Sequence, residues 1–223
     1  MIAVVTREAG RNSDLAKWIG DAADVVEAPL TRTEYRDVDE VAREIQSGAP
    51  YGALVVTSSR AGAYLDAALA ALEKGARVYA VGPATAQVLA ARGAAVAAVG
   101  EGGAESLADV VEGSSVLVVG ARESREELPA ALVARGLVVT RVAAYDTVAM
   151  PVDDGVAWAL ARADVVVVAA PSTWSVARAY VGSGAWVVVP GETTAAAVRK
   201  DHARVVVAWG EGLGAVVAQL DAR

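Results

Sequence analysis

Short runs of consecutive apolar residues, most of them valine, recur along the chain and alternate with segments of helical periodicity. The runs lack the alternation of apolar and polar residues that marks a strand with one face in water, so they predict strands buried on both faces. Strands that alternate with helices indicate parallel sheets covered by helices, an α/β fold. The expected strands are residues 2–5, 25–29, 53–57, 77–81, 95–99, 116–119, 138–143, 164–169, 186–189 and 204–208.

Helical spacing is clearest in three segments, at residues 65–72, 128–132 and 213–220, where apolar side chains recur every three or four positions. Glycine commonly follows the last turn of a helix, so Gly75 and Gly136 are predicted to end the first two. Ten strands are more than one sheet of a chain this long holds comfortably, which indicates two sheets.

The two halves of the chain resemble each other. The matching pairs are residues 81–86 with 190–195, 99–103 with 209–213, 54–58 with 166–172, and 2–7 with 117–122. A repeat this long differs from the short units of a solenoid and indicates two similar α/β domains.

Polar or proline-bearing stretches predict the boundaries, with linkers near 31–37 and 145–151. We expect one discontinuous domain of residues 1–33 plus 150–223 and a second of residues 36–145. In this arrangement the first strand-helix-strand unit joins the sheet of the last strands, a swap that the sequence alone leaves open.

Composition narrows the function. The chain has 20 basic and 27 acidic residues, a net charge of −7, which disfavours nucleic acid as a partner. It has no cysteine and one histidine, His202, which we expect on the surface within a charged run, so metal sites of the haem, zinc and iron–sulfur kinds are disfavoured. The first apolar run meets Arg7 too early for an export signal, and no run reaches the roughly 20 apolar residues of a membrane helix. We expect a cytoplasmic monomer with no membrane partner.

Hydroxyl groups and arginines gather in the loops that follow the expected strands. In parallel sheets these loops lead into helix amino termini, whose N–H groups attract anions, and guanidinium groups suit carboxylates. The candidate binding residues are Thr57, Ser58, Thr85, Arg122, Arg125, Ser172, Thr193 and Thr194, with Arg60 as a further guanidinium. They predict a site for a polyanionic small molecule.

Each of these residues also has a purely structural interpretation. Serine and threonine at such turns commonly cap helices, and the arginines could pair with Glu123, Glu126 or Glu127. The glycines at 210–214 follow a strand, but their spacing does not fit a dinucleotide-binding loop, and we interpret them as tight turns.

An ordered series of motifs along the whole chain resembles the uroporphyrinogen-III synthase family. The series is Val4-Val5-Thr6-Arg7, Val56-Thr57-Ser58, Val81-Gly82-Pro83-Ala84-Thr85-Ala86, Gly120 with Arg125-Glu126-Glu127-Leu128-Pro129, Tyr145-Asp146-Thr147, Ala170-Pro171-Ser172, and residues 191–195. The chain departs from the family pattern at Ser59, where a proline is usual, and at Glu192, an anionic residue in a loop for an anionic ligand.

The resemblance implies two α/β domains joined by a two-stranded linker, and a cofactor-free lyase of tetrapyrrole and heme (porphyrin) biosynthesis. Such enzymes close hydroxymethylbilane to uroporphyrinogen III, inverting ring D and releasing water. By the same resemblance, Tyr145 corresponds to the implicated catalytic tyrosine, and Thr85 and Thr194 to residues that bind substrate carboxylates. Tyr145 could instead anchor a hinge.

Two other classes of protein share parts of this pattern. A non-enzymatic two-lobed protein that binds small anions, of the periplasmic type, would need an export signal. A transferase acting on nucleotides or sugar phosphates would need a metal-binding carboxylate at a strand end or a longer phosphate loop, and the sequence predicts neither. The isomer formed from hydroxymethylbilane would distinguish these classes.

Overall fold

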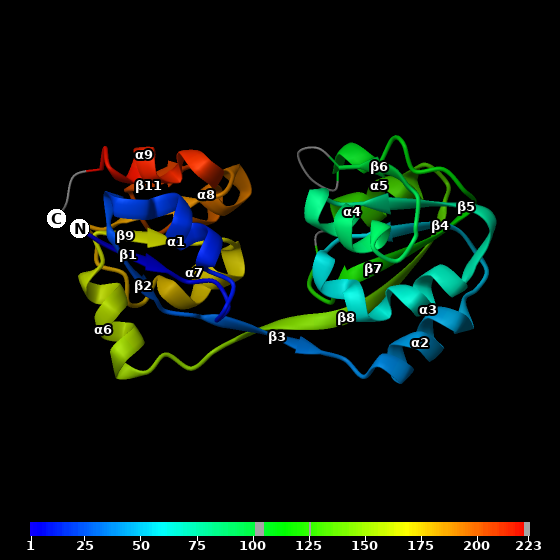
Figure 1. Ribbon diagram of the computed structural model, residues 1–223, viewed down its shortest axis with the longest axis horizontal. Helices are drawn as coiled ribbons and strands as arrows, with labels where there is room; N and C mark the ends of the chain where they lie inside the picture. Colours follow the sequence, from blue (N-terminus) through cyan, green and yellow to red (C-terminus); the bar gives the residue numbers. More distant parts are fainter. Residues whose placement is uncertain (101–104, 125, 221–223) are drawn as a thin grey trace. The chain divides into compact units, whose positions relative to one another are not determined.

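The computed structural model describes residues 1–100, 105–124 and 126–220. Its contacts divide the chain into two compact units (Figure 1), unit 1 with residues Met1–Thr33 and Val148–Arg223 and unit 2 with Glu34–Thr147. Each unit contains one sheet with helices on both faces, so the predicted α/β class with parallel sheets is confirmed.

Unit 1 is built on a five-stranded parallel sheet in the order β11-β10-β9-β1-β2. Its strands are β1 (Ile2–Val5), β2 (Asp24–Glu27), β9 (Val165–Val167), β10 (Trp186–Val189) and β11 (Val205–Val207). Side chains alternate between the two faces of a strand, so consecutive valines enter two different cores. One core contains α1 (Ser13–Ile19) and α9 (Leu213–Val217), and the other α6 (Asp154–Arg162), α7 (Pro171–Ala177) and α8 (Glu192–Val198).

Unit 2 is built on a six-stranded sheet in the order β3-β8-β7-β4-β5-β6. Its strands are β3 (Thr31–Tyr35), β4 (Tyr51–Val56), β5 (Leu72–Ala80), β6 (Val96–Val99), β7 (Ser115–Ala121) and β8 (Val138–Ala149). One face packs on α2 (Val38–Ser47), the 3-10 helix η2 (Ser59–Tyr64), α3 (Leu65–Ala70) and α4 (Pro83–Ala90). The other face packs on α5 (Glu127–Ala134) and on the segment around η3 (Glu105–Leu107).

The two sheets have the same winding once the start of the chain is shifted. In unit 2 the strands β4 to β8 lie in the order β6-β5-β4-β7-β8, and in unit 1 the order β11-β10-β9-β1-β2 repeats it. The segment β1-α1-β2 therefore takes the place that β7-α5-β8 has in unit 2. Figure 1 shows β1 beside β9, although the whole of unit 2 lies between them in sequence.

The pattern of apolar runs did not predict strand β3, because residues 31–37 are polar and were expected to form a linker. The resemblance to the family alone implied that the linker has two strands. A main-chain hydrogen bond joins Arg36 N to Ala144 O (3.2 Å), and a second joins Met150 N to Leu30 O (2.9 Å). The two bonds show that β3 and the last part of β8 run in opposite directions. This strand is stabilised by main-chain hydrogen bonds more than by burial. Such bonds do not require apolar side chains, so the sequence shows no apolar pattern here.

Two further expectations were wrong. The helix expected to end at Gly75 ends at Ala70, and Gly75 lies inside β5 with a φ of +88°, where the register between β4 and β5 shifts. His202 is buried, with 9% of its surface exposed; its Nε2 lies 2.8 Å from Ala185 O and its ring meets that of Trp174 edge-on. The charged residues before His202 in the sequence therefore gave a wrong indication, because the His202 side chain points into the protein.

Arg36 fixes the end of β3 to the rest of unit 2. Its guanidinium donates to Glu44 (2.7 Å), to Glu40 (2.7 Å) and to Ala143 O (2.9 Å), and its own carbonyl accepts from the Tyr64 hydroxyl (2.7 Å). Hydrogen bonds from the guanidinium to Glu44 and Glu40 raise the pKa of Arg36 above its ordinary value. The side chain thus ties β3, β8 and α2 together.

We expect Arg36→Met to lower the free energy of unfolding by about 1–3 kcal/mol, because two carboxylates and a carbonyl lose a charged donor. Arg43→Met is the matched control, since Arg43 donates to Asp39 O on the exposed side of the same helix, and it should change stability by less than about 0.5 kcal/mol. Urea unfolding of both variants measures the difference. Equal midpoints would show that Arg36 does not hold β3 in place.

Candidate active site

The carboxyl ends of β4, β5, β7 and β8 lie at one edge of the unit 2 sheet, because these strands are parallel. The chain winds outward from β4 toward β5 and β6, and then returns on the other side of β4 to form β7 and β8. Loops diverge where the winding reverses, and ligands of open α/β sheets bind at this place. Here the reversal lies between β4 and β7, where the structure places Thr57 and Gly120.

Thr57 joins the two strands at this point. Its main-chain N (3.0 Å) and its Oγ1 (3.4 Å) both donate to Val119 O. Gly120 is required beside it, because a Cβ at residue 120 would lie 1.9 Å from Thr57 Oγ1. The hydroxyl of Thr57 is therefore engaged in a hydrogen bond that stabilises the fold.

Unit 1 has the same contact in reverse at its own switch point, between β9 and β1. The main-chain N (3.3 Å) and Oγ1 (2.7 Å) of Thr6 donate to Val167 O. The threonine thus directly follows β1, the counterpart of β7, and the accepting carbonyl is on β9, the counterpart of β4. Thr6 was part of a matched motif but was not predicted as a bridging residue.

Ser58 caps the helix that follows β4. Its side-chain oxygen accepts a hydrogen bond from Arg60 N (3.2 Å), so the capping interpretation describes its position. Because a hydroxyl can donate while it accepts, Ser58 retains a proton for a ligand.

Three threonines occupy the third position of helices α4, α7 and α8. They are Thr85, Thr173 and Thr194, and all three are buried. The hydroxyl of Thr85 donates back to Val81 O (3.0 Å) at the end of β5. Thr173 was not a predicted site residue, although the spacing of Pro171 to Thr173 repeats that of Pro83 to Thr85.

Ser172 and Thr193 lie one position earlier, at the second residue of their helices, and both are exposed. Beside Thr193, the carboxylate of Glu192 pairs with Arg199. This pairing offsets part of the negative charge that Glu192 brings to the loop.

Arg122 pairs with Asp146 and not with the glutamates named as alternatives. Its Nε lies 2.9 Å and 3.2 Å from the two carboxylate oxygens, and its main-chain N donates to Tyr145 O (2.9 Å). Arg125 lies outside the described residues.

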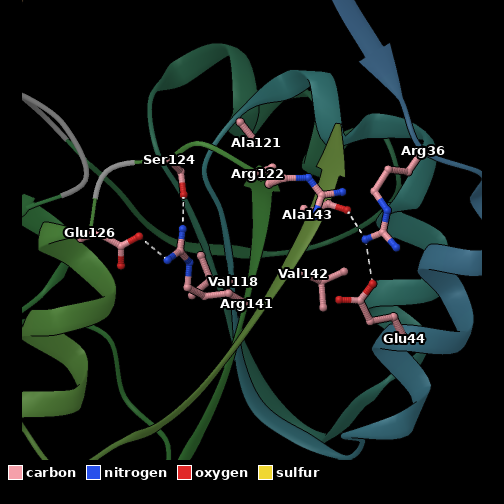
Figure 2. A pocket seen from close by; sticks show the side chains of 11 residues that line it. Arg36, Glu44, Val118, Ala121, Arg122, Ser124, Glu126, Arg141, Val142 and Ala143 are labelled. Atoms are coloured by element: carbon pink, nitrogen blue, oxygen red, sulfur yellow. Dashed lines mark hydrogen bonds and ion pairs between the residues drawn. The ribbon is translucent and has the colours of Figure 1, made fainter. Parts of the chain in front are cut away.

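A cavity of about 260 Å³ opens beside β7 and β8, and Figure 2 shows three arginines around it, Arg36, Arg122 and Arg141. Val118 and Val142 contribute apolar side chains to its lining. Arg141 pairs with Glu126 and Ser124 (2.5 Å and 2.8 Å), so all three guanidinium groups already hold acidic partners. A carboxylate ligand would have to compete with these partners.

Tyr145 is buried, with 4% of its surface exposed, where β8 leaves the parallel sheet. The register shifts between Gly120 and Ala121, which pair with Ala143 and Tyr145, so Ala144 is an extra residue. Its ring lies 6.1 Å from that of Tyr35, and the guanidinium of Arg60 lies 5.9 Å from its ring centre. Arg60 thus approaches an aromatic face, and Tyr35 was not predicted because its position follows from β3.

The described residues contain no group of three or more His, Asp or Glu side chains placed to hold a metal ion. What gathers at the carboxyl edge of unit 2 is a phenol, hydroxyls, main-chain N–H groups and guanidinium groups. Such groups bind carboxylates and donate protons.

Residues 16–218 match the family model described as Uroporphyrinogen-III synthase HemD. The chain belongs to this family. Members of the family are lyases of porphyrin and heme biosynthesis that act on a small-molecule substrate. No curated protein matches the chain significantly.

Solved structures of the family have the same fold. Uroporphyrinogen III synthase from Thermus thermophilus is 19% identical, with a TM-score of 0.65 over 97% of this chain and 96% of that one. The synthetase from Helicobacter pylori is 18% identical, also with a TM-score of 0.65, over 98% of both chains. In the part of the chain that the structure describes, every helix is too short or too polar to span a membrane.

The contact between Thr57 and Gly120 predicts that Gly120→Ala lowers the free energy of unfolding by about 1–3 kcal/mol, because the added methyl group must displace the threonine. Gly191→Ala is the control, since the space around Gly191 is open and its φ of −175° suits any residue. Thermal unfolding followed by circular dichroism measures both. A Gly120→Ala variant as stable as the control would contradict the close contact.

The pair formed by Arg7 and Asp14 (2.9 Å) predicts a pH dependence in unit 1. Partial burial raises the pKa of Asp14, but hydrogen bonds from Arg7 and the main chain outweigh it, and the pKa lies below its ordinary value. A lowered folded-state pKa stabilises the fold above the unfolded pKa of about 4, and this contribution is lost as the pH falls through the folded value. Asp14→Asn should therefore destabilise the protein at pH 7, with a difference that shrinks between pH 5 and pH 3.

Urea midpoints across this range provide the measurement, with the exposed Asp109→Asn as control. A destabilisation by Asp14→Asn that is as large at pH 3 as at pH 7 would exclude the carboxylate as its source.

Proposed function

We propose that this protein closes hydroxymethylbilane to uroporphyrinogen III, inverting ring D and releasing water. The observation that carries the proposal is the family match over residues 16–218. Tyr145, held at the carboxyl edge of the unit 2 sheet, supports it as a proton donor.

The reaction begins with loss of the substrate hydroxyl group. The phenol of Tyr145 gives its proton to this hydroxyl, the carbon–oxygen bond breaks, and water leaves. Electrons of the attached pyrrole stabilise the cation that remains, so neither a metal nor a nucleophile is needed. A phenol is uncharged near neutral pH and can donate in this way.

The eight carboxylates of the substrate bind to donors at the loops. In unit 2 these are Thr57, Ser58, Thr85, Arg122 and Arg125, and in unit 1 they are Ser172, Thr193 and Thr194. The hydroxyl of Thr85 already donates to a carbonyl, so Thr85 binds through its main-chain N–H group. The main-chain and hydroxyl protons of Thr57 both bond to Val119 O, so Thr57 must release one of them to bind a carboxylate. Ser58 keeps its hydroxyl proton and donates it directly.

Local donors explain how a chain of net charge −7 binds a polyanion. Helix amino termini and guanidinium groups act over a few ångströms, and a net charge does not record them. Arg122 exchanges Asp146 for a substrate carboxylate.

The proposal includes two domains, residues 1–33 plus 150–223 and residues 36–145, with linkers near 31–37 and 145–151. The protein acts as a cytoplasmic monomer without cofactor, nucleic acid or membrane. The finding of two compact units supports the division into domains.

We expect Tyr145→Phe to lower kcat by about 10² to 10⁴, because the phenol proton is lost while the ring remains. The assay supplies hydroxymethylbilane, oxidises the product and separates the type III from the type I isomer. Tyr180→Phe, a half-exposed tyrosine in unit 1, is the control and should match the wild type. Full turnover by Tyr145→Phe would remove its role as the acid.

The wild-type protein tests the activity itself in the same assay. Excess type III isomer supports the proposal. Formation of the type I isomer alone, at the spontaneous rate, would refute it, and tight binding of hydroxymethylbilane in that case would favour the non-enzymatic anion-binding alternative.

A further inference from the structure

Tyr35 presents an aromatic ring to solvent beside the buried Tyr145. Tyr35 is 52% exposed, whereas Tyr145 is 4% exposed, and the two rings lie 6.1 Å apart at 53°. Large exposed aromatic side chains next to a site contribute contact area to ligands. A structural role in the core does not account for the exposed half of this ring.

The strand register places both rings on one face of the sheet. Arg36 N bonds to Ala144 O, and Met150 N bonds to Leu30 O, which sets Tyr35 opposite Tyr145 in an antiparallel pair. Side chains of directly opposed residues project to the same side and touch. Tyr35 is therefore fixed relative to the proposed proton donor.

The main chain at Tyr35 is held on its carboxyl side. The carbonyl of Arg36 accepts from Tyr64, and the Arg36 guanidinium binds Glu40, Glu44 and Ala143 O. An exposed ring on an anchored main chain has few degrees of freedom to lose, so it binds a ligand with little loss of conformational entropy.

A cation also lies near the ring of Tyr145. The Arg60 guanidinium lies 5.9 Å from the centre of the Tyr145 ring. Within this group of three side chains, Tyr35 is the one that offers a half-exposed aromatic surface.

From this geometry we infer that Tyr35 is the surface on which the hydroxymethyl-bearing pyrrole ring of the substrate stacks. The inference rests on the proposed function. When Tyr145 transfers its proton and water leaves, the pyrrole and its methylene carbon carry one positive charge. An aromatic face attracts a cation through its quadrupole, so Tyr35 stabilises this charge and holds the ring until it closes.

The test compares Tyr35→Leu, which removes the aromatic face, with Tyr35→Phe, which keeps it. Tyr35→Leu should lower kcat about 3- to 30-fold, the range of a partly desolvated cation–aromatic contact. It should also raise the type I fraction, because a bilane released early closes without inversion. Tyr35→Phe should restore kcat to within about threefold of the wild type and return the isomer ratio to its wild-type value. Tyr180→Leu is the control for loss of a half-exposed tyrosine.

Three results would overturn the inference. They are an unchanged kcat and isomer ratio in Tyr35→Leu, failure of Tyr35→Phe to restore either, and a loss of activity that matches the loss of folded protein seen by circular dichroism. These results differ from failure of the proposed function, in which the wild-type protein itself makes no type III isomer.

Discussion

In each unit the winding of the sheet reverses between two neighbouring strands, and the loops that follow these strands run in opposite directions. The two strands must stay joined beneath the place where the loops diverge. A threonine at the first residue beyond the strand does this in both units, Thr57 in unit 2 and Thr6 in unit 1. Each gives its main-chain and side-chain protons to one carbonyl of the adjacent strand. The contact thus joins the two strands directly below the point where their loops diverge. Because a Cβ at position 120 would clash with the side chain of Thr57, this position requires glycine.

Charge at the unit 2 edge is balanced in pairs. Arg36, Arg122 and Arg141 line one cavity, and each guanidinium holds a carboxylate of the same unit. Such pairs add little stability when exposed, but they keep guanidinium groups oriented. Under the proposed function, an incoming carboxylate exchanges with an internal one, so binding replaces one ion pair by another.

The sequence predicted both sheets well, because strands buried on both faces consist of valine-rich runs that no other local structure explains. The runs at β9 and β10 show this most clearly. The apolar pattern did not predict strand β3, because polar residues 31–35 are held by main-chain bonds to β8, and only the family resemblance implied a two-stranded linker. Tyr35 escaped prediction with it, since its proximity to Tyr145 depends on a register between segments more than 100 residues apart. The loops were predicted to carry the site residues, but whether a hydroxyl such as that of Thr85 faces a ligand or a carbonyl depends on a side-chain rotamer.

The discontinuous course of unit 1 affects how the chain is made. Strand β1 lies between β2 and β9 in its sheet, and β9 begins at Val165. During synthesis the first 33 residues therefore lack their partner strand β9 until all of unit 2 has left the ribosome. Unit 2 is continuous in sequence and can fold during this interval. The order of translation thus sets an order of assembly, in which the nascent amino-terminal segment stays open on one side until the last third of the polypeptide arrives.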